Sequence, residues 1–134
     1  MRVVFAYDGS AFAKRALAYA GRLGPDLEAF VITVSPVLLE APRTAQSMDP
    51  ERDSDDARRH LEDAGAALAE AGVEAEARHL SGNPAAEIIG FAEERGADLI
   101  VMGQRGRSAI SRFIEGSVTD RVVRHAPCDV LVVR

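Results

Sequence analysis

Short apolar runs rich in β-branched residues alternate along the chain with alanine-rich stretches, and this alternation constrains the fold more than any other feature. The apolar runs predict strands at 2–8, 27–35, 73–81, 97–103 and 128–134. Strands that are separated by helices run parallel, with right-handed crossovers, and the helices then cover both faces of the sheet. We therefore expect an α/β fold, with one domain over 1–134 built on an open, doubly wound, five-stranded parallel sheet (Rossmann-like, order 3-2-1-4-5).

Capping residues predict where the helices begin and end. Ser10 and Asn83-Pro84 are typical helix starts, and Gly96 is a typical helix stop. With similar signals elsewhere, we expect helices over 10–23, 49–72, 83–96 and 117–125. The segment 36–48 contains two prolines and no clear period, so we expect a loop there. The segment 73–81 alternates apolar and polar residues, which favours a strand near the edge of the sheet.

Composition and charge exclude several classes of function. The net charge is −5, which argues against non-specific binding to nucleic acid, because that depends on a basic surface. The sequence has no apolar run long enough to cross a bilayer, and its start, "RVVFAYDGS", has no features of a signal peptide. The single cysteine, Cys128, fits a reducing compartment. We expect a cytoplasmic protein that binds neither nucleic acid nor membrane.

The topology predicts where a ligand would lie. Open α/β sheets bind ligands beyond the carboxyl ends of the strands, at the point where the strand order reverses. In the expected order this point lies between the first and fourth strands. Asp8 ends the first of these and Gly103 ends the fourth, so both residues would flank one crevice.

The segment "MGQRGRSAISRFIEGSV" (102–118) has the composition of an anion-binding loop. Gly103 and Gly106 would let the backbone approach a ligand closely and adopt unusual torsion angles. Gly116 and Ser117 begin a helix, whose free N–H groups favour an anion. Several arginines add local positive charge, and local potential rather than net charge decides binding. Each residue alone also has an ordinary structural interpretation, such as a strand end or a helix cap, but together they favour a phosphate site.

The spacing Gly103-x2-Gly106-x9-Gly116-Ser117, together with "AYDGS" after the first strand, resembles the ATP-binding branch of the universal stress protein family. The segments "GNPAAEII", "GADLIVMGQRG" and "GSVTDRVVRHAPCDVLVV" extend the resemblance over 2–134. The resemblance implies a stress-response regulatory protein that binds an adenine nucleotide, ATP with or without Mg²⁺. Such a protein acts as a nucleotide-dependent sensor or interaction module on an unknown downstream protein.

The resemblance also implies roles for individual residues. In the family, the acid after the first strand contacts the nucleoside, and Asp8 matches it. Val34 and Ala6 match the lining of the adenine pocket, Met102 and Gly103 match positions beside the ribose and phosphates, and the residues from Gly106 to Val118 include the triphosphate positions. The expected binding residues are Ala6, Tyr7, Asp8, Val34, Met102, Gly103, Arg105, Gly106, Gly116, Ser117 and Val118. We expect no catalytic residue and no metal ligand.

Two other functions remain open alternatives. One is an interaction protein of the same fold that does not bind nucleotide, and the other is a slow ATP hydrolase. Efficient catalysis is disfavoured, because Lys14 lies outside any glycine-rich loop and no second carboxylate accompanies Asp8 to hold a metal. A phospho-receiver is excluded, since the acidic pair, the later aspartate and the lysine that its chemistry needs are all missing.

The last strand, 128–134, would form an apolar edge of the sheet. An open apolar edge invites pairing, and two-fold antiparallel pairing would cover both edges at once. Because family members commonly pair in this way, the resemblance implies a homodimer through this strand. Whether the loop 36–48 closes over the ligand is left open.

Overall fold

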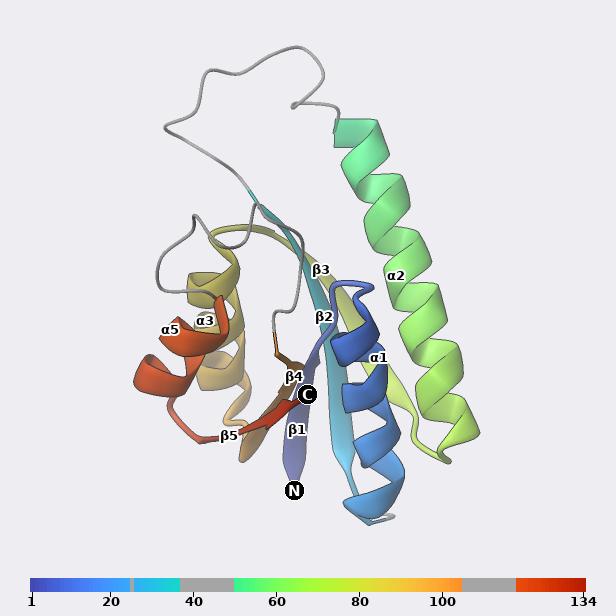
Figure 1. Ribbon diagram of the computed structural model, residues 1–134, viewed down its shortest axis with the longest axis vertical. Coiled ribbons are helices and arrows are strands. Elements are labelled where there is room, and N and C mark those ends of the chain that lie inside the picture. Colours follow the sequence, from blue (N-terminus) through green and yellow to red (C-terminus); the bar gives the residue numbers. More distant parts are fainter. Residues whose placement is uncertain (25, 37–49, 105–117) are drawn as a thin grey trace.

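The computed structural model describes residues 1–24, 26–36, 50–104 and 118–134, with only the backbone of 50–53 (Figure 1). Parallel strands form one five-stranded sheet in the order β3-β2-β1-β4-β5. The predicted sheet, its strand order and the edge positions of β3 and β5 are thereby confirmed. The strands are β1 (Arg2–Ala6), β2 (Glu28–Pro36), β3 (Ala75–Gly82), β4 (Leu99–Gly103) and β5 (Asp129–Val133).

Two of the described helices begin at the caps that the sequence predicts, Ser10 and Asn83. The Ser10 hydroxyl accepts a hydrogen bond from the Ala13 amide at 3.2 Å, and the Asn83 side chain accepts one from Ala86 at 3.0 Å. Gly96 ends its helix in the left-handed conformation, with φ 61°. The helices are α1 (Ala11–Ala18, continued by a 3₁₀ turn at Tyr19–Arg22), α2 (Pro50–Glu70), α3 (Pro84–Arg95) and α5 (Val118–His125). Within the described ranges, no helix is long and apolar enough to cross a membrane.

The boundary between the second strand and the following loop differs from the prediction. Pro36 was predicted to lie in a loop, but β2 continues through it, opposite Gly82 of β3. Proline is tolerated at the end of a strand where its missing N–H costs little. The rest of the predicted loop, 37–48, lies outside the described residues.

Alternate side chains of the strands enter two separate hydrophobic clusters, one on each face of the sheet. Helices α1 and α2 cover one face, and α3 and α5 cover the other (Figure 1). In β1, Val3 and Phe5 enter the α1/α2 cluster together with Tyr7, whereas Val4 and Ala6 enter the α3/α5 cluster. Side chains along a strand alternate with a period of two, and this alternation continues one residue past the end of β1, where Tyr7 joins the cluster that contains Val3 and Phe5.

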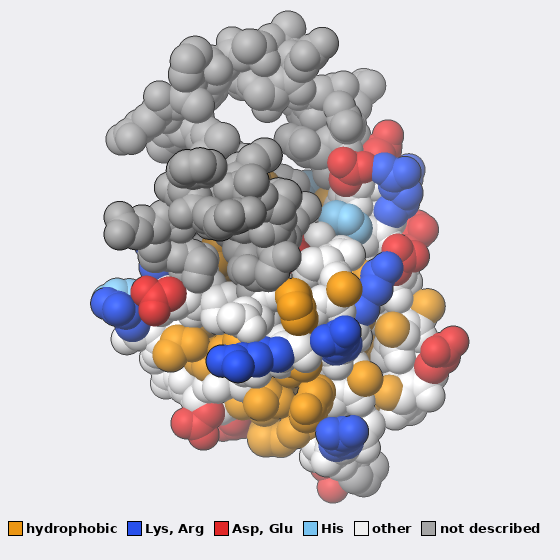
Figure 2. All heavy atoms as spheres, in the orientation of Figure 1, with side chains coloured by type: hydrophobic (Ala, Val, Ile, Leu, Met, Phe, Trp, Pro, Cys, Tyr) orange, Lys and Arg blue, Asp and Glu red, His pale blue; other side chains and the backbone are white. Residues whose placement is uncertain are grey.

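The outer edge of β5 offers backbone groups for pairing. The Gln104 amide donates to the Val133 carbonyl at 2.7 Å, so the backbone groups of Val133 face β4. Backbone groups alternate in direction along a strand, and those of Val130 and Val132 therefore face outward. In the described sheet no strand pairs with this edge. The surface on this side of the molecule carries apolar side chains between lysine and arginine side chains (Figure 2).

Candidate functional site

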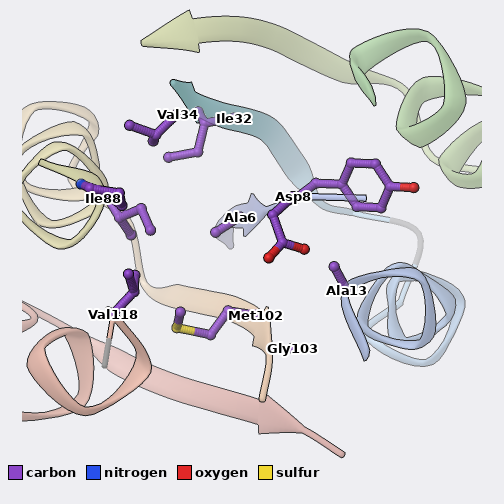
Figure 3. A pocket seen from close by; sticks show the side chains of 11 residues that line it. Ala6, Asp8, Ala13, Ile32, Val34, Ile88, Met102, Gly103 and Val118 are labelled. Carbon is purple, nitrogen blue, oxygen red and sulfur yellow. The ribbon is translucent and has the colours of Figure 1, made fainter. Parts of the chain in front are cut away.

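A pocket lies beyond the carboxyl ends of β1, β2 and β4, where the strand order reverses (Figure 3). It contains about 550 Å³ of empty space, part of it open to solvent. Its lining comes from strand ends, the turn after β1 and the first turns of three helices. The lining residues are Ala6, Tyr7, Asp8, Ala13, Ile32, Val34, Pro84, Ile88, Met102, Gly103 and Val118.

The structure brings together every predicted site residue that it describes. These are Ala6, Tyr7, Asp8, Val34, Met102, Gly103 and Val118. The other predicted residues, Arg105, Gly106, Gly116 and Ser117, lie outside the described residues. Their position relative to the pocket therefore stays a prediction, as does the binding role of every residue in the set.

One end of the pocket has an apolar wall that was predicted only in part. Ile32 shares a face of β2 with Val34, and Ile88 lies one turn after Pro84 on α3 (Figure 3 shows Ile32, Val34 and Ile88). Ala13, Ile32, Pro84 and Ile88 were not predicted. The period of two along β2 is the signal that would have placed Ile32 beside Val34. Pro84 and Ile88 are four residues apart in the helix predicted after Asn83, and this spacing would likewise have placed both on one face of α3.

Ala6 leaves room at the floor of the pocket. It pairs with Ile32 of β2 on one side and with Met102 of β4 on the other. Its side chain is a single methyl group, half-buried, between two larger apolar side chains (Figure 3). A flat apolar ring would therefore find contacts on the strands below it and on α3 and Val118 beside it.

Asp8 supplies a carboxylate at the mouth of the pocket. Its side chain extends into the space between Ala6 and Ala13 (Figure 3). The Oδ1 atom accepts a hydrogen bond from the Ser10 amide at 2.9 Å, which forms an Asx turn. Among the described residues the other oxygen, Oδ2, has no hydrogen-bond partner. One oxygen thus orients the carboxylate, and the other is available to a ligand donor.

Gly103 has a different structural role from the one expected. It is the last residue of β4 and has no positive φ, so the prediction of an unusual backbone conformation there is wrong. A Cβ at this position would lie 2.4 Å from the Ala13 nitrogen and 2.4 Å from the Phe12 carbonyl carbon. Gly103 is therefore required because the end of β4 packs directly on the backbone of α1.

Tyr7 borders the pocket, but its ring packs in the α1/α2 cluster. Burial raises the pKa of the phenol, and the negative charges of Asp63 and Asp8 raise it further. The Tyr7 ring contacts the His60 ring in an edge-to-face arrangement, with the two ring centroids 6.0 Å apart. Tyr7 thus contributes a fixed, uncharged group beneath the turn that carries Asp8.

The described residues contain no group of three or more histidine, cysteine or acidic side chains that could hold a metal ion. Cys128 is half-buried just before β5, and burial raises the pKa of its thiol, with Asp129 and Asp98 adding to the effect. This environment disfavours the thiolate, which is the reactive form.

The sequence of the chain is similar to those of known universal stress proteins. The sequence profile of the universal stress protein family matches residues 1–134. Universal stress protein YxiE of Bacillus subtilis is 35% identical over 146 residues, covering 99% of this chain and 98% of the relative. Universal stress protein MJ0531 of Methanocaldococcus jannaschii is 33% identical over 138 residues, covering 99% of this chain and 81% of the relative.

Solved structures agree with the sequence comparison. A universal stress protein in complex with cAMP superposes with a TM-score of 0.77 at 29% identity, over 100% of this chain and 97% of the other. The universal stress protein of Archaeoglobus fulgidus in complex with dAMP superposes with a TM-score of 0.73 at 26% identity, over 100% and 98% of the two chains. Strand order, sequence profile and overall superposition thus agree, and the chain belongs to the universal stress protein family.

Proposed function

We propose that the protein binds an adenine nucleotide, ATP in particular, in the pocket at the ends of β1 and β4, and that it acts as a nucleotide-dependent regulatory protein in a stress response. The observation that carries the proposal is the composition of this pocket, in which an apolar wall faces a single oriented carboxylate. Related structures in complex with cAMP and dAMP support the same ligand class.

The two ends of the pocket fit the two parts of a nucleoside. The apolar wall of Ile32, Val34, Ile88 and Val118 would contact the faces of the base. The free oxygen of Asp8 would accept a hydrogen bond from a ribose hydroxyl. Such a charge-assisted bond contributes about 1.5–3 kcal/mol. The phosphates would then lie beside Gly103, and the segment 105–117, which comes next in the sequence, contains the predicted Gly106, Gly116 and Ser117.

The pocket favours binding over catalysis. Among the described lining residues, Asp8 and Tyr7 are the ionisable ones, and the phenol has a raised pKa. Efficient phosphoryl transfer uses a metal clamp and a residue that positions the nucleophile. Since the described lining supplies neither, a regulatory role is the better hypothesis and slow hydrolysis is an alternative to test.

The decisive experiment identifies the bound ligand directly. The purified protein is denatured and any released nucleotide is identified. The emptied, refolded protein is then titrated by calorimetry with ATP, ADP and AMP, each with and without Mg²⁺. Binding of ATP at micromolar concentration or better is expected. If no adenine nucleotide binds, the proposal is overturned and an interaction protein that works without nucleotide becomes the better explanation.

We further propose that two copies pair through the β5 edge. The outward backbone groups of Val130 and Val132 and the apolar side chains around them support this arrangement (Figure 2). Two-fold antiparallel pairing would satisfy the same groups on both copies at once. Light scattering at micromolar concentration should give the mass of a dimer, and a monomer mass would contradict the proposal.

A further inference from the structure

The ring of His60, on α2, lies against the turn that follows β1. A Cβ built on Gly9 would be 2.7 Å from Nε2 of His60 and 3.1 Å from its Cδ2. Gly9 has a φ of 80°, in the left-handed region that favours glycine. The imidazole therefore occupies the space that a side chain at position 9 would need.

His60 also contacts the residue on the other side of Asp8. The Tyr7 and His60 rings meet at 90°, with centroids 6.0 Å apart. Edge-to-face ring pairs of this kind add to stability beyond the area that they bury. His60 thus touches both chain neighbours of Asp8, although it does not itself line the pocket.

The turn also has internal support from its own hydrogen bonds. The Ser10 amide donates to Asp8, and the Ser10 hydroxyl accepts from Ala13 in the first turn of α1. Glycine at position 9 is free to adopt many backbone conformations, so these hydrogen bonds alone leave the turn adaptable. A rigid ring packed on Gly9 removes part of that freedom.

We propose that His60 is a positioning residue, which fixes the Tyr7-Asp8-Gly9 turn and thereby the direction of the Asp8 carboxylate in the pocket. The α2 helix supports this turn from outside, and the ligand pays less conformational entropy on binding because Asp8 is already oriented. The effect on ligand binding rests on the proposed function. The effect on the turn itself does not.

The ligand-free test measures hydrogen exchange of the Ser10 amide, whose protection depends on its bond to Asp8. The variant is His60→Ala, and the matched control is Glu62→Ala, an exposed residue on the same helix. We expect exchange at Ser10 to be roughly three- to tenfold faster in His60→Ala than in the control, after correction for any change in global stability. Equal exchange in the two variants would overturn the proposal.

The ligand-bound test is a double-mutant cycle with Asp8→Ala. We expect His60→Ala to weaken ATP binding by roughly three- to tenfold in the wild-type background and to have no effect in the Asp8→Ala background. An equal loss in both backgrounds would mean that His60 acts through general stability and not through Asp8. If the wild-type protein binds no adenine nucleotide, the proposed function fails, and the exchange measurement alone decides the role of His60.

Discussion

The end of β4 and the first turn of α1 are in backbone contact at Gly103 and Ala13. A methyl group on Gly103 would be 2.4 Å from the Ala13 nitrogen, and the nearest atoms include backbone, which cannot rotate away. This contact sets one wall of the pocket, because both residues line it. The glycine that the sequence motif assigns to a phosphate is thus also needed for the packing of α1 on the sheet.

Gly103→Ala should therefore destabilise the folded protein. We expect a loss of about 1–3 kcal/mol, since overpacking of this kind forces backbone shifts. Gly90→Ala in α3 is the control, because no atom of the described residues lies within 4 Å of a Cβ there. That control should be neutral or stabilising by about 0.5–1 kcal/mol. Urea unfolding compares the two, and equal stability of both variants would show that the β4–α1 contact is not tight.

Asp8→Ala should weaken ATP binding by roughly ten- to a hundredfold, because a charge-assisted hydrogen bond to the ligand is lost. Asp26→Ala removes an exposed aspartate before β2, at the opposite end of the sheet, and should leave affinity unchanged. Calorimetric titration measures both. If the two variants bind ATP equally well, Asp8 does not contact the nucleoside.

Ala6→Leu should block the base end of the pocket. The larger side chain would extend into the space between Ile32 and Met102, and we expect ATP affinity to fall by at least roughly tenfold. The fold should persist, because the pocket offers room for the added carbons. Ala18→Leu, on the exposed face of α1, is the size-matched control. Retained affinity in Ala6→Leu would place the ligand elsewhere.

The fold could be predicted from the sequence, because each strand and helix carries its own signal. The residues Leu99–Met102 are all apolar and β4 lies inside the sheet, whereas 73–81 alternates and β3 is an edge. Asn83 and Gly96 bound α3 by local chemistry that does not depend on the rest of the molecule.

The pocket could be predicted only in part. Asp8 and Val34 follow from strand ends and from family resemblance. Ile88 reaches the pocket only through the packing of α3 on the sheet, and the contact between Gly103 and α1 depends on the angle of a helix. Such distances between elements are set by tertiary packing, which a pattern of residues along the chain does not encode directly. The contact between His60 and Gly9 is likewise set by tertiary packing, so the sequence pattern does not predict it.

Ionisation of the Tyr7 phenol should lower the free energy of unfolding at alkaline pH. Because the pKa of its phenol is raised in the folded protein, the folded state holds this proton more tightly than the unfolded state does. Its contribution is complete below the ordinary tyrosine pKa of about 10 and is lost as the pH rises through the raised value. The free energy of unfolding of Tyr7→Phe should therefore decline less steeply above about pH 9 than that of the wild type. Parallel declines in urea unfolding would contradict the raised pKa.

Val132→Pro should convert a dimer into a monomer. Proline removes the outward N–H of Val132, and this group does not face β4, so the sheet keeps its own hydrogen bonds. Light scattering at micromolar concentration should give half the wild-type mass, with an unchanged circular dichroism spectrum. An unchanged mass would mean that the copies meet at another surface.

The sheet separates two hydrophobic clusters, and the apolar wall of the pocket comes almost entirely from the α3/α5 side. The outer surface of α2 lies on the opposite side, beyond its own cluster (Figure 1). The exposed positions of α2 can change without altering any described residue that lines the pocket. Descendants of one gene could thus change the outer surface of α2 while keeping the same pocket, and the two could diverge at different rates.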